Sequence, residues 1–85
     1  MERSTAFDFA GSIERAAEIV TEGTAFFTPE YLAGQYAYEG ARDGEGDVND
    51  ADTLAAHLDY LAEAGAEFNK SKALNIAMEF VAAAE

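Results

Sequence analysis

The sequence contains no cysteine, only one proline, and only five basic residues among 85. Without cysteine, the chain has no disulfide framework, no thiolate ligand for zinc and no thiol nucleophile. This composition suits a reducing, intracellular setting. Apolar residues make up 49% of the chain, which is enough for one modest hydrophobic core. We therefore expect a single domain over residues 1–85.

Long apolar runs are also missing. Polar residues interrupt the first ten positions, so the apolar stretch of a secretory signal is not found there. No later segment approaches the roughly 20 apolar residues that a membrane-spanning helix needs. We therefore expect a cytoplasmic protein.

Negative charge is what the chain has in excess. Seventeen carboxylates and five basic side chains give a formal net charge of −12. Nucleic acids and anionic membranes attract lysine and arginine and repel carboxylates, so we expect the chain to bind neither directly. The partner that such a field attracts is a basic protein surface.

Start and stop signals predict four helices, over about 12–24, 29–42, 51–64 and 70–83. Ser12 and Asn69 are predicted N-caps of the first and last helices, and Asn49 or Asp50 caps the third. Pro29, at the first position of the second helix, is the clearest start signal. Gly34 and Gly40 weaken that helix by about 1 kcal/mol each relative to alanine.

Apolar residues at helical spacing predict which faces are buried. Leu54, Leu58 and Leu61 form the stripe of the third helix, and the fourth presents Leu74, Ala77, Met78 and Val81. Short connections favour antiparallel neighbours, so we expect an all-α fold, a compact bundle of four short helices. Residues 4–10 alternate between apolar and polar side chains, which is also compatible with a short extended N-terminal arm.

The carboxylates are regularly placed. Two sets share the i, i+4, i+8 spacing: Glu14, Glu18, Glu22 and Asp59, Glu63, Glu67. On a helix each set would form one stripe, with neighbours about 6 Å apart along the axis. Like charges at this spacing destabilise a helix by about 0.2 to 0.5 kcal/mol per pair, so selection for helix stability alone would tend to interleave lysine.

Residues 43–67 form an acidic block with no lysine or arginine, containing Asp43, Glu45, Asp47, Asp50, Asp52, Asp59, Glu63 and Glu67. We expect residues 43–50 to be a polar loop. A block of one sign creates a coherent field, which favours a surface shaped for a basic groove. The alternative is an ordinary solvated face that keeps a small protein soluble.

No pattern predicts a cofactor or a reaction. Counted from Asp43, the acidic loop has Val48 at the sixth place and Leu54 at the twelfth, where an EF-hand needs glycine and a bidentate glutamate. His57, the single histidine, has no triad partners at i±3 or i±4. We therefore expect no metal, no cofactor and no enzymatic activity.

Aromatic residues are concentrated in the middle of the chain and are expected to be mostly core. Tyr36 and Tyr38 cannot point the same way on one helix, so at least one is expected to be partly exposed. An exposed tyrosine among carboxylates suits an interface anchor for arginine. The expected partner-binding residues are therefore Tyr36 and Tyr38 together with Glu14, Glu18, Glu22 and the eight acids of the block.

In size and charge layout the chain resembles the small acidic phage-encoded inhibitors that mimic DNA, among them anti-CRISPR and anti-restriction proteins. The resemblance rests on Glu14, Glu18, Glu22 and the block over residues 43–67. It implies an inhibitor that occupies the DNA-binding site of a nucleic-acid-binding protein or nuclease, such as a CRISPR effector or a restriction enzyme. Phosphates recur every 3.4 Å or so along a DNA strand, and carboxylates on two helices could approach that charge density.

Two other functions fit the same composition. A general interaction or adaptor domain would use acidity for solubility and selectivity, and would bind through an aromatic patch. A housekeeping protein of a salt-loving organism would carry an acidic, lysine-poor surface as an adaptation.

Overall fold

The helices of the computed structural model begin and end close to the predicted positions. The structure describes residues 12–43 and 50–84, and within them the elements are α1 (Ile13–Glu22), α2 (Pro29–Asp43), α3 (Ala51–Glu63) and α4 (Lys70–Ala84). Those residues contain no strand, so the predicted all-α bundle of four helices is confirmed. The alternating segment over residues 4–10 lies outside the described residues.

Side-chain caps fix the helix starts. The Ser12 hydroxyl accepts a hydrogen bond from the Arg15 amide at 3.1 Å, and the Thr28 hydroxyl accepts one from the Tyr31 amide at 3.1 Å. Asp50 caps α3 by accepting from the Asp52 amide, and Asn69 caps α4 by accepting from the Lys72 amide. These bonds satisfy amides that have no partner within their own helices.

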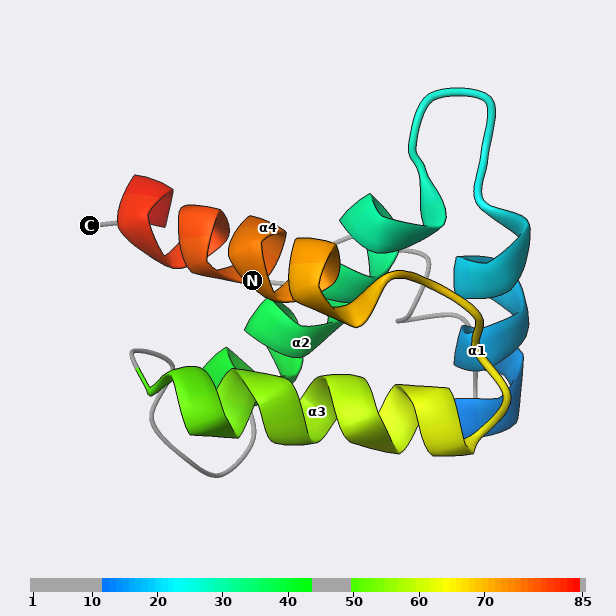
Figure 1. Cartoon of the computed structure of the whole chain (residues 1–85), viewed down its shortest axis with the longest axis horizontal. Coiled ribbons are helices and arrows are strands. Elements are labelled where there is room, and N and C mark those ends of the chain that lie inside the picture. Colours follow the sequence, from blue (N-terminus) through cyan, green and yellow to red (C-terminus); the bar gives the residue numbers. More distant parts are fainter. Residues whose placement is uncertain (1–11, 44–49, 85) are drawn as a thin grey trace.

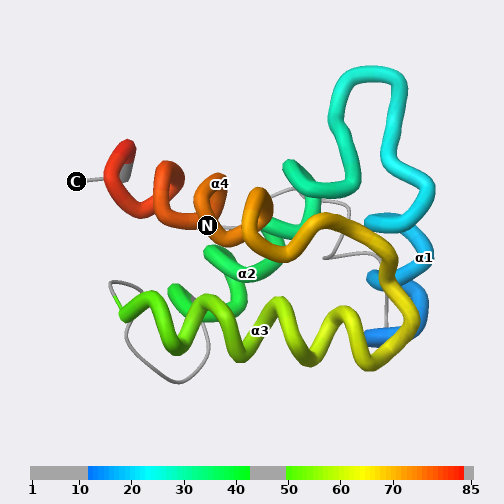
Figure 2. Tube along the Cα trace, in the orientation of Figure 1, coloured from blue at the N-terminus to red at the C-terminus, as the bar shows by residue number. Residues whose placement is uncertain are grey.

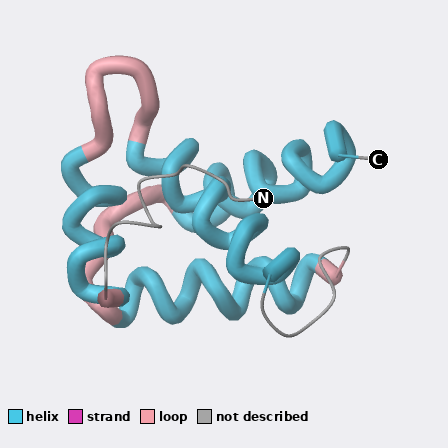
Figure 3. Tube along the Cα trace, turned by 180° about the vertical axis from the view of Figure 1, so that it is seen from behind, coloured by secondary structure: helices cyan, strands magenta, loops and turns pink. Residues whose placement is uncertain are grey.

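Helix α2 is the centre of the arrangement, packing most extensively against α4 and next against α3. Helix α1 stands at the end of α3, and the connection from α3 to α4 passes beside it (Figures 1 and 2). The loop between α1 and α2, residues 23–28, extends away from the packed helices, as the reverse view shows (Figure 3).

Alanine and leucine dominate the core. The largest fully buried side chains are Leu54, Leu58, Leu61 and Val20, so the predicted leucine stripe of α3 is confirmed. Small residues fill much of the remainder: Ala16, Ala17, Ala33, Ala37, Ala41, Ala66, Ala73 and Ala77. Their short side chains let the helix backbones approach closely.

The predicted buried face of α4 needs correction. Met78 is 46% exposed, whereas Ala73 and Ala77 are completely buried. A β-carbon built on Gly34 of α2 would lie 2.9 Å from the carbonyl oxygen of Ala73. Helix α4 therefore packs closely on α2 where Gly34 meets Ala73 and Ile76, and this orientation leaves Met78 at the surface.

Candidate functional site: the acidic stripe of α1

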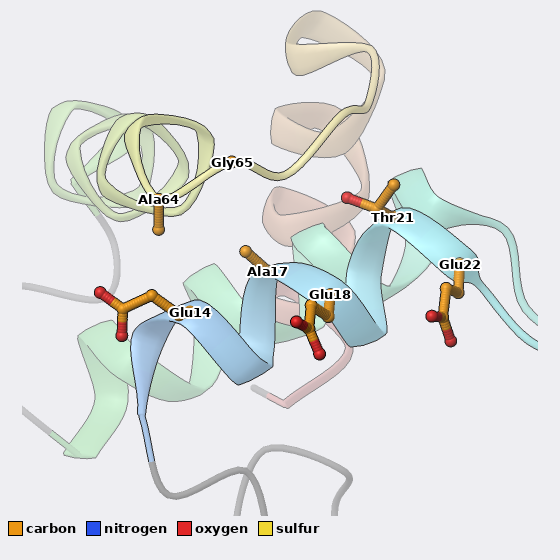
Figure 4. A pocket seen from close by; sticks show the side chains of 7 residues that line it. All are labelled: Glu14, Ala17, Glu18, Thr21, Glu22, Ala64 and Gly65. Carbon is orange, nitrogen blue, oxygen red and sulfur yellow. The ribbon is translucent and has the colours of Figure 1, made fainter.

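Three glutamates form a continuous stripe along α1. Glu14, Glu18 and Glu22 are exposed, and they border a shallow hollow of about 270 Å³ between α1 and the end of α3 (Figure 4). Ala17, Thr21, Ala64 and Gly65 complete its lining. The apolar positions Ala16, Ala17 and Val20 are buried, and this anchoring holds the glutamates at the surface. We call Glu14, Glu18 and Glu22 the acidic stripe.

Glu18 of the acidic stripe has a basic neighbour among the described residues. The Arg15 guanidinium donates to Glu18 at 2.8 Å, and both side chains are more than half exposed. An exposed pair of this kind contributes little to stability because water screens it. It lowers the local negative charge, so Glu14 and Glu22 carry more of the stripe's field than Glu18 does.

The connection after α3 brings further acids next to α1. The Glu67 amide donates to the Thr21 hydroxyl at 3.0 Å, which ties this connection to the last turn of α1. Glu63 and Glu67 are exposed on either side of the segment that closes the hollow. Acids far apart in the sequence are thus brought to one end of the bundle.

The prediction that Asp59, Glu63 and Glu67 form a second stripe on one helix is wrong. Helix α3 ends at Glu63, its C-cap is Ala64, and Gly65 has φ +114. Glu67 therefore lies beyond the helix and does not continue the spacing of Asp59 and Glu63. Asp59 in turn accepts a hydrogen bond from the Lys70 ammonium group, so part of its charge is neutralised locally.

The other described acids of the block lie at the end of α2 and at the start of α3. Asp43 is the last residue of α2 rather than the start of a loop. Asp50 and Asp52 lie at the start of α3, about 20 Å along the axis from its other end. Glu45 and Asp47 lie outside the described residues. The described members of the block thus lie at the end of α2, at both ends of α3 and in the connection to α4, whereas Glu14, Glu18 and Glu22 line one hollow.

Both predicted tyrosine anchors are partly buried and point to different helices. Burial raises the pKa of Tyr36, and the nearby Tyr60 of α3 raises it further. Tyr38 packs on Phe80 of α4, with ring centroids 5.7 Å apart, and the Arg42 guanidinium lies 5.1 Å from its centroid. The surface of Tyr38 that a partner's arginine would use is thus already occupied by Arg42.

The sequence reasoning missed a more exposed aromatic surface. Phe26 is 87% exposed and Phe27 44% exposed, although the aromatics were expected to be mostly core. The signal was available, because Phe26 and Phe27 lie between Gly23 and Pro29, outside the predicted helices, so no helical spacing places them on a buried face.

Within 12–43 and 50–84, no group of three or more histidine or carboxylate side chains is placed to hold a metal ion. None of the helices described is long and apolar enough to cross a membrane. Comparison of the chain with protein-family models, with curated proteins and with solved structures finds no match.

Proposed function

We propose that this protein binds the cationic nucleic-acid site of another protein and inhibits it as a nucleic-acid mimic. The observation that supports this most directly is the acidic stripe, three exposed glutamates on one face of α1. The net charge of −12 gives the surrounding field the same sign. A nuclease, such as a CRISPR effector or a restriction enzyme, offers the lysine and arginine groove that such a surface fits.

The energetics of the stripe favour a role in binding over a role in folding. Glu14 and Glu18 repel each other at i, i+4, as do Glu18 and Glu22, at a cost of about 0.2 to 0.5 kcal/mol per pair. Arg15 offsets part of this at Glu18. A cationic groove would relieve the rest, so binding and helix stability would be coupled through the same side chains.

Affinity capture with matched charge variants tests the proposal. Immobilised wild type is compared with Glu14→Gln/Glu22→Gln, which leaves the Arg15–Glu18 pair in place, and with Glu39→Gln/Glu85→Gln, which removes the same charge at positions outside the expected partner-binding set. The proposal predicts that wild type and the second variant retain a nucleic-acid-binding protein and that the first variant loses it. Retention should fall when salt is raised to about 0.5 M, because screening weakens contacts between exposed charges.

Two results would overturn the proposal. Equal retention by both variants would show that the acidic stripe is not the contact surface. Captured proteins without any nucleic-acid-binding site would show that the surface recognises something other than a polynucleotide groove.

A further inference from the structure

A row of aromatic rings crosses the surface formed by α2 and α4. Phe27 stacks on Tyr31 with centroids 4.6 Å apart, Tyr31 meets Phe80 at 5.4 Å, and Phe80 stacks on Tyr38 at 5.7 Å. Phe27 is exposed and the other rings are only partly buried. We call these four rings the aromatic row. The aromatic row lies on α2, α4 and the loop before α2, whereas the acidic stripe lies on α1.

The loop at one end of the row is held in shape by its own hydrogen bonds. The Thr24 hydroxyl accepts from the amides of both Phe26 and Phe27, at 3.1 and 2.9 Å. The Thr24 amide donates to the Phe27 carbonyl oxygen at 3.0 Å. Phe26 is therefore presented to solvent on an ordered turn. Such preorganisation lowers the entropy cost of using it as a binding anchor.

A small apolar hollow adjoins the row. It has a volume of about 240 Å³, and the described residues that line it are Tyr31, Ile76, Phe80 and Ala83 together with the charged residue Glu79. An apolar side chain fits such a lining. A cation next to that side chain would meet Glu79.

The chain itself shows how a cation sits on these rings. At the other end of the row, the Arg42 guanidinium lies 5.1 Å from the Tyr38 centroid, a cation–π distance. Phe27 and Tyr31 carry no such partner among the contacts of the described residues. A partner's arginine could occupy the equivalent place on them.

The net charge of the protein indicates what kind of partner binds at the aromatic row. A second copy of this chain would bring another net charge of −12 to the surface, and this repulsion opposes self-association. A basic segment is attracted by the same field. We propose that the aromatic row, Phe26 and the adjoining hollow form a second interaction surface, which binds an amphipathic, arginine-bearing segment of a partner protein. This proposal is independent of nucleic-acid mimicry by the acidic stripe.

A designed peptide provides the probe. It is an amphipathic peptide of about 15 residues with leucine on one face and arginine on the other, compared with an equally charged peptide in which glutamine replaces leucine. Binding is followed by fluorescence anisotropy, and the site is located from the NMR shifts of the protein's aromatic rings. The leucine peptide should bind at least about tenfold more tightly than the glutamine peptide, and should shift the rings of Phe26, Tyr31 and Phe80.

Matched variants locate the surface. Phe26→Ser should weaken binding of the leucine peptide about tenfold, and Glu79→Gln should weaken it by a smaller factor. Tyr60→Ser truncates an aromatic residue of α3 that is 54% exposed and lies outside the row, so it should leave binding unchanged. Phe26 is almost fully exposed, and circular dichroism should show that its variant keeps wild-type helicity.

These experiments distinguish failure of the aromatic-row proposal from failure of the nucleic-acid-mimic proposal. Loss of peptide binding in Glu14→Gln/Glu22→Gln but not in Phe26→Ser would overturn the aromatic surface, as would equal affinity for both peptides. A dimer of the free protein that Phe26→Ser dissociates would also overturn it, because a second copy would then be the occupant. Peptide binding that is weakened in Phe26→Ser and unchanged in Glu14→Gln/Glu22→Gln supports it whatever the acidic stripe binds, and binding unchanged in both variants overturns it.

Discussion

Gly34 of α2 lies directly against Ile76 of α4: a β-carbon at position 34 would lie 2.8 Å from Ile76 Cγ2. The same atom would lie 2.9 Å from the Ala73 carbonyl oxygen, which belongs to the backbone and cannot rotate away. The glycine that weakens α2 as an isolated helix is thus the residue that lets α2 and α4 pack closely.

Gly34→Ala should therefore destabilise the fold, although alanine is the better helix former. The gain in helix propensity is about 1 kcal/mol, and overpacking a helix interface costs about 1 to 3 kcal/mol. We expect a net loss of up to about 2 kcal/mol in the free energy of unfolding, measured by urea denaturation.

Gly40→Ala is the matched control. A β-carbon at position 40 would lie 2.9 Å from His57 Nδ1, but the His57 ring ends a partly exposed side chain that can turn aside. The variant should lie within about 1 kcal/mol of wild type. A larger loss at position 40 than at position 34 would contradict this account of α2–α4 packing.

The cap of α1 gives a second stability prediction. Ser12→Ala removes the acceptor of the Arg15 amide and should cost about 1 kcal/mol. Ser71→Ala, at an exposed site inside α4, should change stability by less than about 0.5 kcal/mol. Equal effects of the two substitutions in thermal unfolding would show that the Ser12 cap does not stabilise α1.

Glu30 makes stability depend on pH. Its carboxylate accepts a hydrogen bond from the Asn69 amide at 2.8 Å, and this bond, with a smaller attraction from Lys72, holds the pKa of Glu30 below its usual value. A lowered folded-state pKa contributes stability above the unfolded-state pKa, and that contribution is lost as the pH falls through the folded-state pKa. Glu30→Gln should therefore be less stable than wild type at pH 7, and the difference should shrink below about pH 4. An undiminished difference in acid would contradict the assignment.

Much of the fold could be predicted because its signals are local. Ser12, Pro29 and Asp50 mark helix starts within a residue or two of themselves, and Leu54, Leu58 and Leu61 recur at the period of one buried helix face. The surroundings of Gly34 could not be predicted, since its contacts with Ala73 and Ile76 arise only once α2 and α4 are docked. Met78 was wrongly predicted to be buried, because the face of α4 that is buried also depends on how α4 docks on α2.

In the candidate site, too, the features within one helix could be predicted, and the contacts between helices could not. The acidic stripe lies on one helix, so spacing alone predicted its geometry. The Asp59, Glu63, Glu67 stripe failed because the spacing continued past the end of α3, where Gly65 has a positive φ. Neither the Asp59–Lys70 pair nor the aromatic row could be predicted, because each joins residues of different helices.

Ionic strength separates a mimic from a halophilic protein. Self-repulsion at a net charge of −12 is screened by salt, so the melting temperature should rise by a few degrees between about 10 mM and 0.5 M salt. We expect the far-ultraviolet circular dichroism to remain helical in the dilute buffer, because the core over all four helices is continuous. A chain unfolded in dilute buffer and folded only at high salt would favour the halophilic alternative.

Competition with DNA tests the central claim most directly. Once affinity capture has supplied a nucleic-acid-binding protein, its binding to a labelled duplex is titrated with this chain at several duplex concentrations. The mimic predicts competitive displacement, in which added duplex restores DNA binding fully and Glu14→Gln/Glu22→Gln displaces much less DNA than wild type. A ternary complex of target, duplex and chain, or displacement unaffected by the two substitutions, would contradict the claim.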